Sequence, residues 1–218
     1  MAKNDTYRIG IDGSWSLEDF YEFPRVFGQV YAFHCAFALE AHDPERLVHT
    51  FESFPWRGGY SAVNFYGSLY SQIPPRLRPQ VKSIRYASPG WIELTELMFL
   101  AAIGVGRVVK GFVNSASALN KLYGEIYEGL HARELMRVEA KREHLELAKR
   151  ELDFAEGASE RLAKGLGFEN PAALNELTGN QLATVKILLS DFRRIRTLAS
   201  YVEEGKAEFP ADETGEQD

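Results

Sequence analysis

The feature that most constrains this fold is a change of sequence periodicity near residue 95. From about residue 96 to about residue 205 the chain consists mostly of residues with high helix propensity, and its apolar residues recur at helical spacing. Before that point, three short segments alternate between apolar and polar residues. Such a chain is expected to combine a small sheet with long helices.

The three alternating segments predict strands that bury one face. Apolar residues such as Ile9, Ile84 and Ile92 occupy one side of each segment, and charged residues occupy the other side. This pattern is typical of an antiparallel sheet with one face in solvent. The segments are YRIGIDG (7–13), VKSIRYA (81–87) and WIELTE (91–96).

Two helices are expected between the first and second of these strands. Ser16 is the predicted N-cap of the first helix, and Pro24 is expected to interrupt it before its apolar stripe continues. The second helix should end at the prolines of IPPRLRP (73–79). The segment DPERLVHTFESF (43–54) is compatible with either a short helix or a strand.

A turn signature, SPGW (88–91), separates the last two predicted strands. Proline presets φ at the second position of a type II turn, and glycine takes the positive φ of the third position. We therefore predict a type II turn at this corner, which closes the sheet and leads into the helical half.

Two long helical segments follow. The run 97–106 contains ten apolar residues and ends at Arg107. It is shorter than the roughly 20 residues that span a bilayer, so we expect a helix buried in a bundle or an oligomer. In the second segment Val138, Leu145 and Leu152 are seven residues apart, with Ala148, Ala155 and Leu162 between them, which predicts a heptad-like seam.

The charge distribution argues against nucleic-acid binding. The net charge is −6, and residues 203–218 carry seven acidic groups and one lysine, so the body of the chain is neutral. The single cysteine, Cys35, excludes an internal disulfide. The first ten residues contain no apolar signal segment, and we expect a cytoplasmic protein.

The polar residues of the sequence form no recognised catalytic motif. A cluster between Glu40 and Glu52 includes His42 and His49 but lacks metal-ligand spacing, and a solvated helix end accounts for it. Gly104 and Gly106 fail the dinucleotide fingerprint and are expected to permit close helix packing. The arginines of FRRIRT (192–197) are interpreted as cations near a helix C-terminus. We expect no cofactor and no metal.

The sequence therefore predicts an α+β protein, with a small antiparallel sheet covered by helices and a long-helix bundle or coiled-coil-like arm. The predicted divisions are a domain at 1–95, a helical domain at 96–205 and an acidic disordered tail at 206–218.

The apolar seam of a long helix has to be buried against another helix. We therefore expect a non-enzymatic interaction or assembly subunit, such as an adaptor, that binds itself or another helical protein. The alternatives are a bundle that covers its own seam, a membrane-acting effector using 97–113, and a metal-dependent enzyme at 40–52. Aromatic residues beside turns are expected to seal the ends of a small core, and the alternative is a protein-binding patch that includes an arginine. The candidate interaction residues are Trp56, Arg57, Trp91, Leu97, Phe99, Leu100, Val138, Leu145, Leu152 and Leu162.

Overall fold

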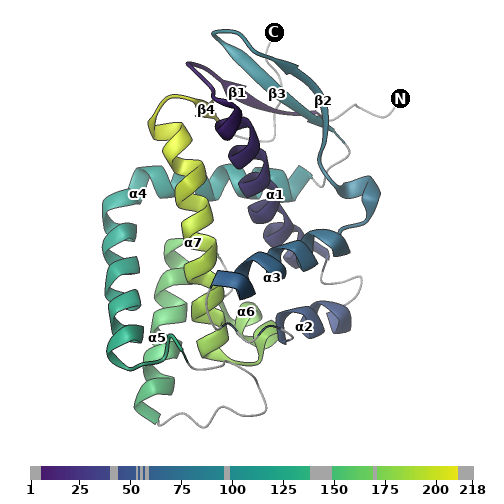
Figure 1. Ribbon diagram of the computed structural model, residues 1–218. Helices are drawn as coiled ribbons and strands as arrows, with labels where there is room; N and C mark the ends of the chain where they lie inside the picture. Colours follow the sequence, from purple (N-terminus) through teal and green to yellow (C-terminus); the bar gives the residue numbers. More distant parts are fainter. Residues whose placement is uncertain are drawn as a thin grey trace. The chain divides into compact units, whose positions relative to one another are not determined.

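The computed structural model confirms an α+β protein with a four-stranded antiparallel sheet and several helices (Figure 1). The structure describes residues 6–39, 44–52, 54, 56, 59–95, 99–137, 149–168 and 171–210. The strands are β1 (Tyr7–Ile11), β2 (Gln80–Arg85), β3 (Gly90–Thr95) and β4 (Ala207–Glu208). The helices are α1 (Leu17–Leu39), α2 (Pro44–Glu52), α3 (Gly59–Gln72), the 3-10 helix η1 (Pro75–Leu77), α4 (Phe99–Ala132), α5 (Lys149–Gly165), α6 (Pro171–Thr178) and α7 (Gln181–Glu203).

The chain divides into two compact units, each made of segments that are distant in sequence. Unit 1 comprises 1–39, 70–114 and 194–218, and unit 2 comprises 40–69 and 115–193. In α4 the division falls at Ser115, whose φ of −125° and ψ of 16° are not helical. The domain bounds expected from the sequence stay a prediction.

In unit 1 the strand order is β2-β3-β1-β4, and every neighbouring pair is antiparallel. The alternation in β1 buries Tyr7, Ile9 and Ile11 and exposes Arg8. Helices of the same unit cover the buried face. The ring of Tyr7 lies 6.5 Å from that of Phe27 in α1.

Close packing near the start of α4 depends on Gly104 and Gly106, as predicted. A Cβ on Gly104 would lie 3.2 Å from the His34 Nδ1 atom, and a Cβ on Gly106 would lie 2.9 Å from the Tyr7 hydroxyl. Cys35 is a core residue, as predicted, whereas His34 is half-buried as a residue and has a buried Nε2 atom. Burial lowers the pKa of His34 to about 4 and raises the pKa of the Cys35 thiol.

Pro24 does not interrupt the first helix, contrary to the prediction, because α1 runs continuously from Leu17 to Leu39. Proline removes only one donor, which would have bonded to the Phe20 carbonyl. Pro24 is exposed, so that carbonyl can bond to water instead. The ambiguous segment 43–54 contributes a helix, α2.

The predicted type II turn is wrong. Gly90 lies within β3 and lacks the positive φ that this turn requires, and the Ser88–Pro89 peptide bond is cis. Glycine is needed there for a different reason: a Cβ on Gly90 would collide with the carbonyl oxygen of Arg85 and the backbone of Ala87. The corner therefore joins β2 and β3 in a hairpin whose loop passes over Gly90.

The predicted tail segment, 206–218, contains a short strand. Ala207 and Glu208 form β4 beside β1, and Phe209 is buried with its ring 6.4 Å from that of Phe27. The open edge of β1 and this apolar contact hold the segment in place. Residues 211–218 lie outside the described residues.

In unit 2 part of the second predicted helical segment is not helical. Residues 133–137 form turns, with Glu134 at φ 57°, and 138–148 lie outside the described residues. On α5, Ala155 and Leu162 are buried, but Leu152 is 39% exposed. A coiled coil stays a prediction.

Candidate interaction surface

The structure places the predicted aromatic residues in different units. Trp56 is buried in unit 2, where its carbonyl accepts a hydrogen bond from Lys186 Nζ at 3.2 Å and its ring meets the edge of Phe65. Trp91 is half-buried on β3 of unit 1. Arg57 lies outside the described residues.

The predicted helical contacts are also dispersed. Leu100 is exposed near the start of α4, and Leu162 is buried in unit 2. Phe99 is the first residue of α4. Leu97, Val138 and Leu145 lie outside the described residues.

An apolar surface that the sequence did not single out lies on β2. This strand is at one edge of the sheet and is exposed on both faces (Figure 1). Val81 and Ile84 pair with the buried Leu94 and Ile92, so they belong to the core face. They are nevertheless 56% and 51% exposed. The helical cover of the sheet therefore ends before β2.

The start of α1 extends this apolar surface. Leu17 is 89% exposed and Tyr21 is 70% exposed, and the helical spacing of four residues places them on one side of α1. Tyr86, directly after β2, is more than half exposed and meets the ring of Phe20 edge-on at 5.9 Å. We call Leu17, Tyr21, Val81, Ile84 and Tyr86 the apolar edge surface.

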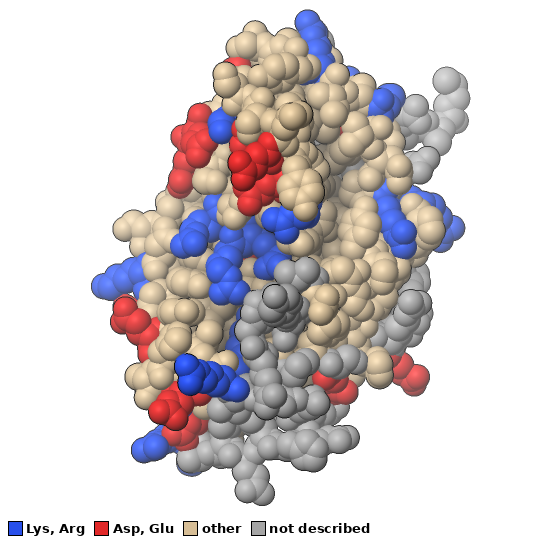
Figure 2. Space-filling model, in the orientation of Figure 1, with Lys and Arg blue, Asp and Glu red and all other residues tan. Residues whose placement is uncertain are grey.

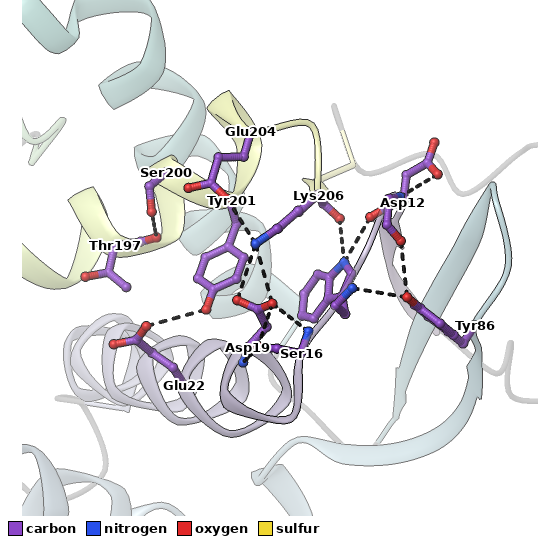
Figure 3. A network of polar contacts seen from close by, with 12 residues as sticks. Asp12, Ser16, Asp19, Glu22, Tyr86, Thr197, Ser200, Tyr201, Glu204 and Lys206 are labelled. Carbon is purple, nitrogen blue, oxygen red and sulfur yellow. Dashed lines mark hydrogen bonds and ion pairs between the residues drawn. The ribbon is translucent and has the colours of Figure 1, made fainter.

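Hydrogen bonds hold Tyr86 against the start of the helix (Figure 3). Its hydroxyl accepts a bond from the Trp15 backbone N–H at 3.1 Å and donates to the Gly13 carbonyl at 3.2 Å. The Trp15 indole N–H donates to the carbonyls of Asp12, at 3.1 Å, and Lys206, at 3.2 Å. Tyr86 is thus fixed by backbone groups on both sides of Ser14, just before α1.

The predicted N-cap, Ser16, is confirmed, and Asp19 reciprocates. Ser16 Oγ accepts a bond from the Asp19 N–H at 3.1 Å, and the Ser16 N–H donates to Asp19 Oδ2 at 2.7 Å. This backbone bond is the main cause that lowers the pKa of Asp19, and Lys206 Nζ pairs with the same carboxylate at 3.4 Å. The exposed first turn of α1 is therefore rigid, which limits the ordering cost of binding.

The outer face of the sheet carries charged residues around Trp91. The guanidinium carbons of Arg8 and Arg85 lie 5.5 and 4.7 Å from the Trp91 ring centroid. Glu93 accepts bonds from Lys82 Nζ at 3.0 Å and Ser83 Oγ at 2.9 Å. These bonds lower the pKa of Glu93, and the bond from Lys82 has the largest effect. An aromatic and arginine-rich patch thus exists at Trp91, built from strand neighbours.

The arginines of α7 do not lie at a helix C-terminus, contrary to the prediction. Arg193, Arg194 and Arg196 occupy the middle of a helix that ends at Glu203, and Figure 2 shows basic side chains gathered over that part of α7. The macrodipole acts mainly within the last turn, so it does not explain them. Arg194 Nε instead donates to Gln29 of α1 at 2.8 Å.

Lys186 is the most deeply buried cation among the described side chains of unit 2. Its ammonium donates to the carbonyls of Trp56, at 3.2 Å, and Met136, at 3.3 Å. Burial lowers its pKa to about 8. These bonds join two backbone segments, so the geometry supports a structural role.

The polar cluster at 40–52 is only partly described, because residues 40–43 lie outside the described residues. Glu45, His49 and Glu52 are on α2. Within the described ranges, no group of three or more His, Cys, Asp and Glu residues is placed to hold a metal ion.

Two further observations bear on function. Of the helices in the described part of the chain, none combines the length and the apolar character needed to cross a membrane. Known protein families, curated protein sequences and solved structures give no match to this chain.

Proposed function

We propose that this protein is a non-enzymatic interaction subunit and that the apolar edge surface of unit 1 is its contact site. The observation that carries the proposal is the exposure of five large apolar side chains on β2, its following turn and the start of α1. Exposed apolar residues are common singly, but several of them on adjoining segments, linked here through Tyr86, are typical of an interaction site.

The energetics indicate what kind of contact this surface makes. Complete burial of an exposed Val, Leu or Ile contributes roughly 1.5–3 kcal/mol. Burial of Leu17, Val81 and Ile84 therefore contributes at most roughly 9 kcal/mol, which is of the same order as the roughly 4–15 kcal/mol that association costs. The partner therefore has to add polar or backbone contacts to those with the apolar edge surface.

The contact site proposed here differs from the helical seam. Ala155 and Leu162, two described residues of that seam, are buried inside unit 2. Their burial favours the alternative in which the chain covers its own seam. The uncovered apolar side chains of β2 make unit 1 the better contact site.

Photo-crosslinking of the full chain in its native cell tests the proposal. A photoreactive phenylalanine analogue replaces Ile84 or Tyr21, and a matched control replaces Glu208, which is exposed on the opposite edge strand. We expect discrete adducts at positions 84 and 21 and none at 208.

The mass of the adduct identifies the partner class: twice the chain mass indicates self-association, and any other discrete mass indicates a different protein. If neither position 84 nor position 21 gives a discrete adduct, the proposed function is overturned.

A further inference from the structure

The outer edge of β2 has no strand partner in the described part of the chain. On its inner side β2 pairs with β3, with Ile84 opposite Ile92 and Arg85 opposite Trp91. The backbone N–H and C=O groups of the outer edge therefore remain available for another strand. Proteins that bind extended peptides use such an edge, where main-chain hydrogen bonds supply affinity.

One common protection of an edge strand, a lysine that projects across it, is absent from β2. In natural proteins, a lysine side chain on an edge strand often prevents another strand from pairing with it. Lys82 occupies the irregular position between Val81 and Ser83, but its ammonium bonds to Glu93 on β3 at 3.0 Å. The guanidinium of Arg85 lies over Trp91, also on β3. Both cations thus lean over the sheet and leave the edge open.

The two sides of β2 present different chemistry to an added strand. The core side offers Val81 and Ile84, both more than half exposed. The outer side offers two cations, Lys82 and Arg85, and no acidic residue of β2 itself. Successive residues of a strand point to opposite faces. An added strand therefore meets apolar and basic groups in alternation.

We infer that the edge of β2 binds an extended segment in which acidic and apolar residues alternate, added to the sheet as a fifth strand. The inference rests on the proposed function and names the kind of partner. The acidic side chains of the segment lie on the outer face of the sheet, which carries Lys82 and Arg85, and its apolar side chains cover Val81 and Ile84. Backbone pairing along β2 supplies the contacts that the apolar edge surface lacks.

Two other occupants match the edge less well. The β2 strand of a second copy brings the same two cations, so its outer side repels that of the first. Residues 211–218 of the chain contain four acidic residues but no large apolar residue. They therefore complement the basic side of β2 but cannot cover its apolar side. An acidic and apolar strand from another protein satisfies both.

Binding of synthetic peptides to the full chain tests the inference. The probe is a fluorescein-labelled peptide of about ten residues that alternates Glu and Val, and fluorescence anisotropy gives its Kd. One control has the same composition with the Glu and Val residues in separate blocks, and another alternates Lys and Val. We expect the alternating Glu peptide to bind at least about tenfold more tightly than either control.

Backbone methylation of the probe tests strand addition directly. N-methylation of alternate residues removes donors along one edge of the peptide without changing its charge. We expect it to weaken binding at least about tenfold. The variants Ile84→Glu and Arg85→Glu should weaken binding similarly, whereas Glu208→Gln on the opposite edge should have no effect. The double variant Lys82→Glu, Arg85→Glu should prefer the alternating Lys peptide.

Each outcome has a distinct meaning. Equal binding of the methylated and unmethylated peptides overturns strand addition. No binding of any peptide, with adducts still formed at position 84, overturns the inference but leaves the proposed function intact. A dimer in solution that Ile84→Glu dissociates would show that a second copy occupies the edge, and this also overturns the inference.

Discussion

Tyr86 accepts a hydrogen bond from the backbone N–H of Trp15, 71 positions earlier in the chain, at 3.1 Å. The same hydroxyl donates to the Gly13 carbonyl at 3.2 Å. These two bonds join the end of the edge strand to the start of α1. They hold the strand and helix parts of the apolar edge surface together.

Replacing Tyr86 with Phe should remove both bonds while retaining the ring contact with Phe20. Each intramolecular hydrogen bond contributes about 0.5–1.5 kcal/mol, so the free energy of unfolding should fall by about 1–3 kcal/mol. Urea unfolding followed by circular dichroism measures the change. Tyr21→Phe removes an exposed hydroxyl and should stay within about 0.5 kcal/mol of the wild type. Equal stability of the two variants would refute the role of Tyr86.

Gly129 and Gly124 form a matched pair on α4 within unit 2. A Cβ on Gly129 would lie 2.5 and 2.8 Å from two ring carbons of Phe154 on α5, whereas a Cβ on Gly124 meets nothing within 4 Å. Gly129→Ala should therefore destabilise the protein by about 1–3 kcal/mol through overpacking. Gly124→Ala should stabilise it by roughly 0.5–1 kcal/mol. Thermal and urea unfolding compare them, and effects of the same sign would contradict the packing described.

His34 should make the protein sensitive to acid. Burial lowers its pKa from 6.5 to about 4, so between these pH values the unfolded chain binds more protons than the folded chain. The free energy of unfolding therefore falls as the pH drops from 6.5 towards 4.

The comparison with His34→Gln isolates this effect from that of the carboxylates. Between pH 7 and pH 4.5 the wild type should lose about 2–3 kcal/mol more than the variant. Urea unfolding at several pH values measures both proteins. Parallel pH profiles would show that His34 does not titrate in this way.

Lys186 should make the free energy of unfolding depend on pH in the alkaline range. Burial lowers its pKa from 10.5 to about 8, so the unfolded chain again binds more protons between these values. The free energy of unfolding should rise by about 2 kcal/mol between pH 8 and pH 9.5 as the buried ammonium loses its charge. Lys186→Met should lack this rise. If urea unfolding shows the same rise in both proteins, Lys186 is not its source.

The sequence predicted the elements that have a clear period. The starts of β1, β2 and β3 agree with the structure within one residue, because each strand alternates around a buried face. β4 contains two residues, which is too short to show a period. Its position depends on pairing with β1, a contact that no local pattern reveals.

The apolar edge surface could not be predicted for a related reason. Ile84 and Ile92 occupy equivalent positions in the alternating pattern and share the core face, yet only Ile92 is buried. Their difference depends on where the helical cover ends, which is a property of the assembled unit. In the same way, Arg8 and Arg85 come together over Trp91 only through the register of three strands.

The pairing of β4 with β1 also sets the order in which unit 1 can form. The indole of Trp15 bonds to the carbonyl of Lys206, 191 positions later in the chain. Because β1 leaves the ribosome long before β4, the margin of β1 that pairs with β4 stays uncovered until β4 has been synthesised. The nascent chain is exposed to wrong strand pairing at this margin until then.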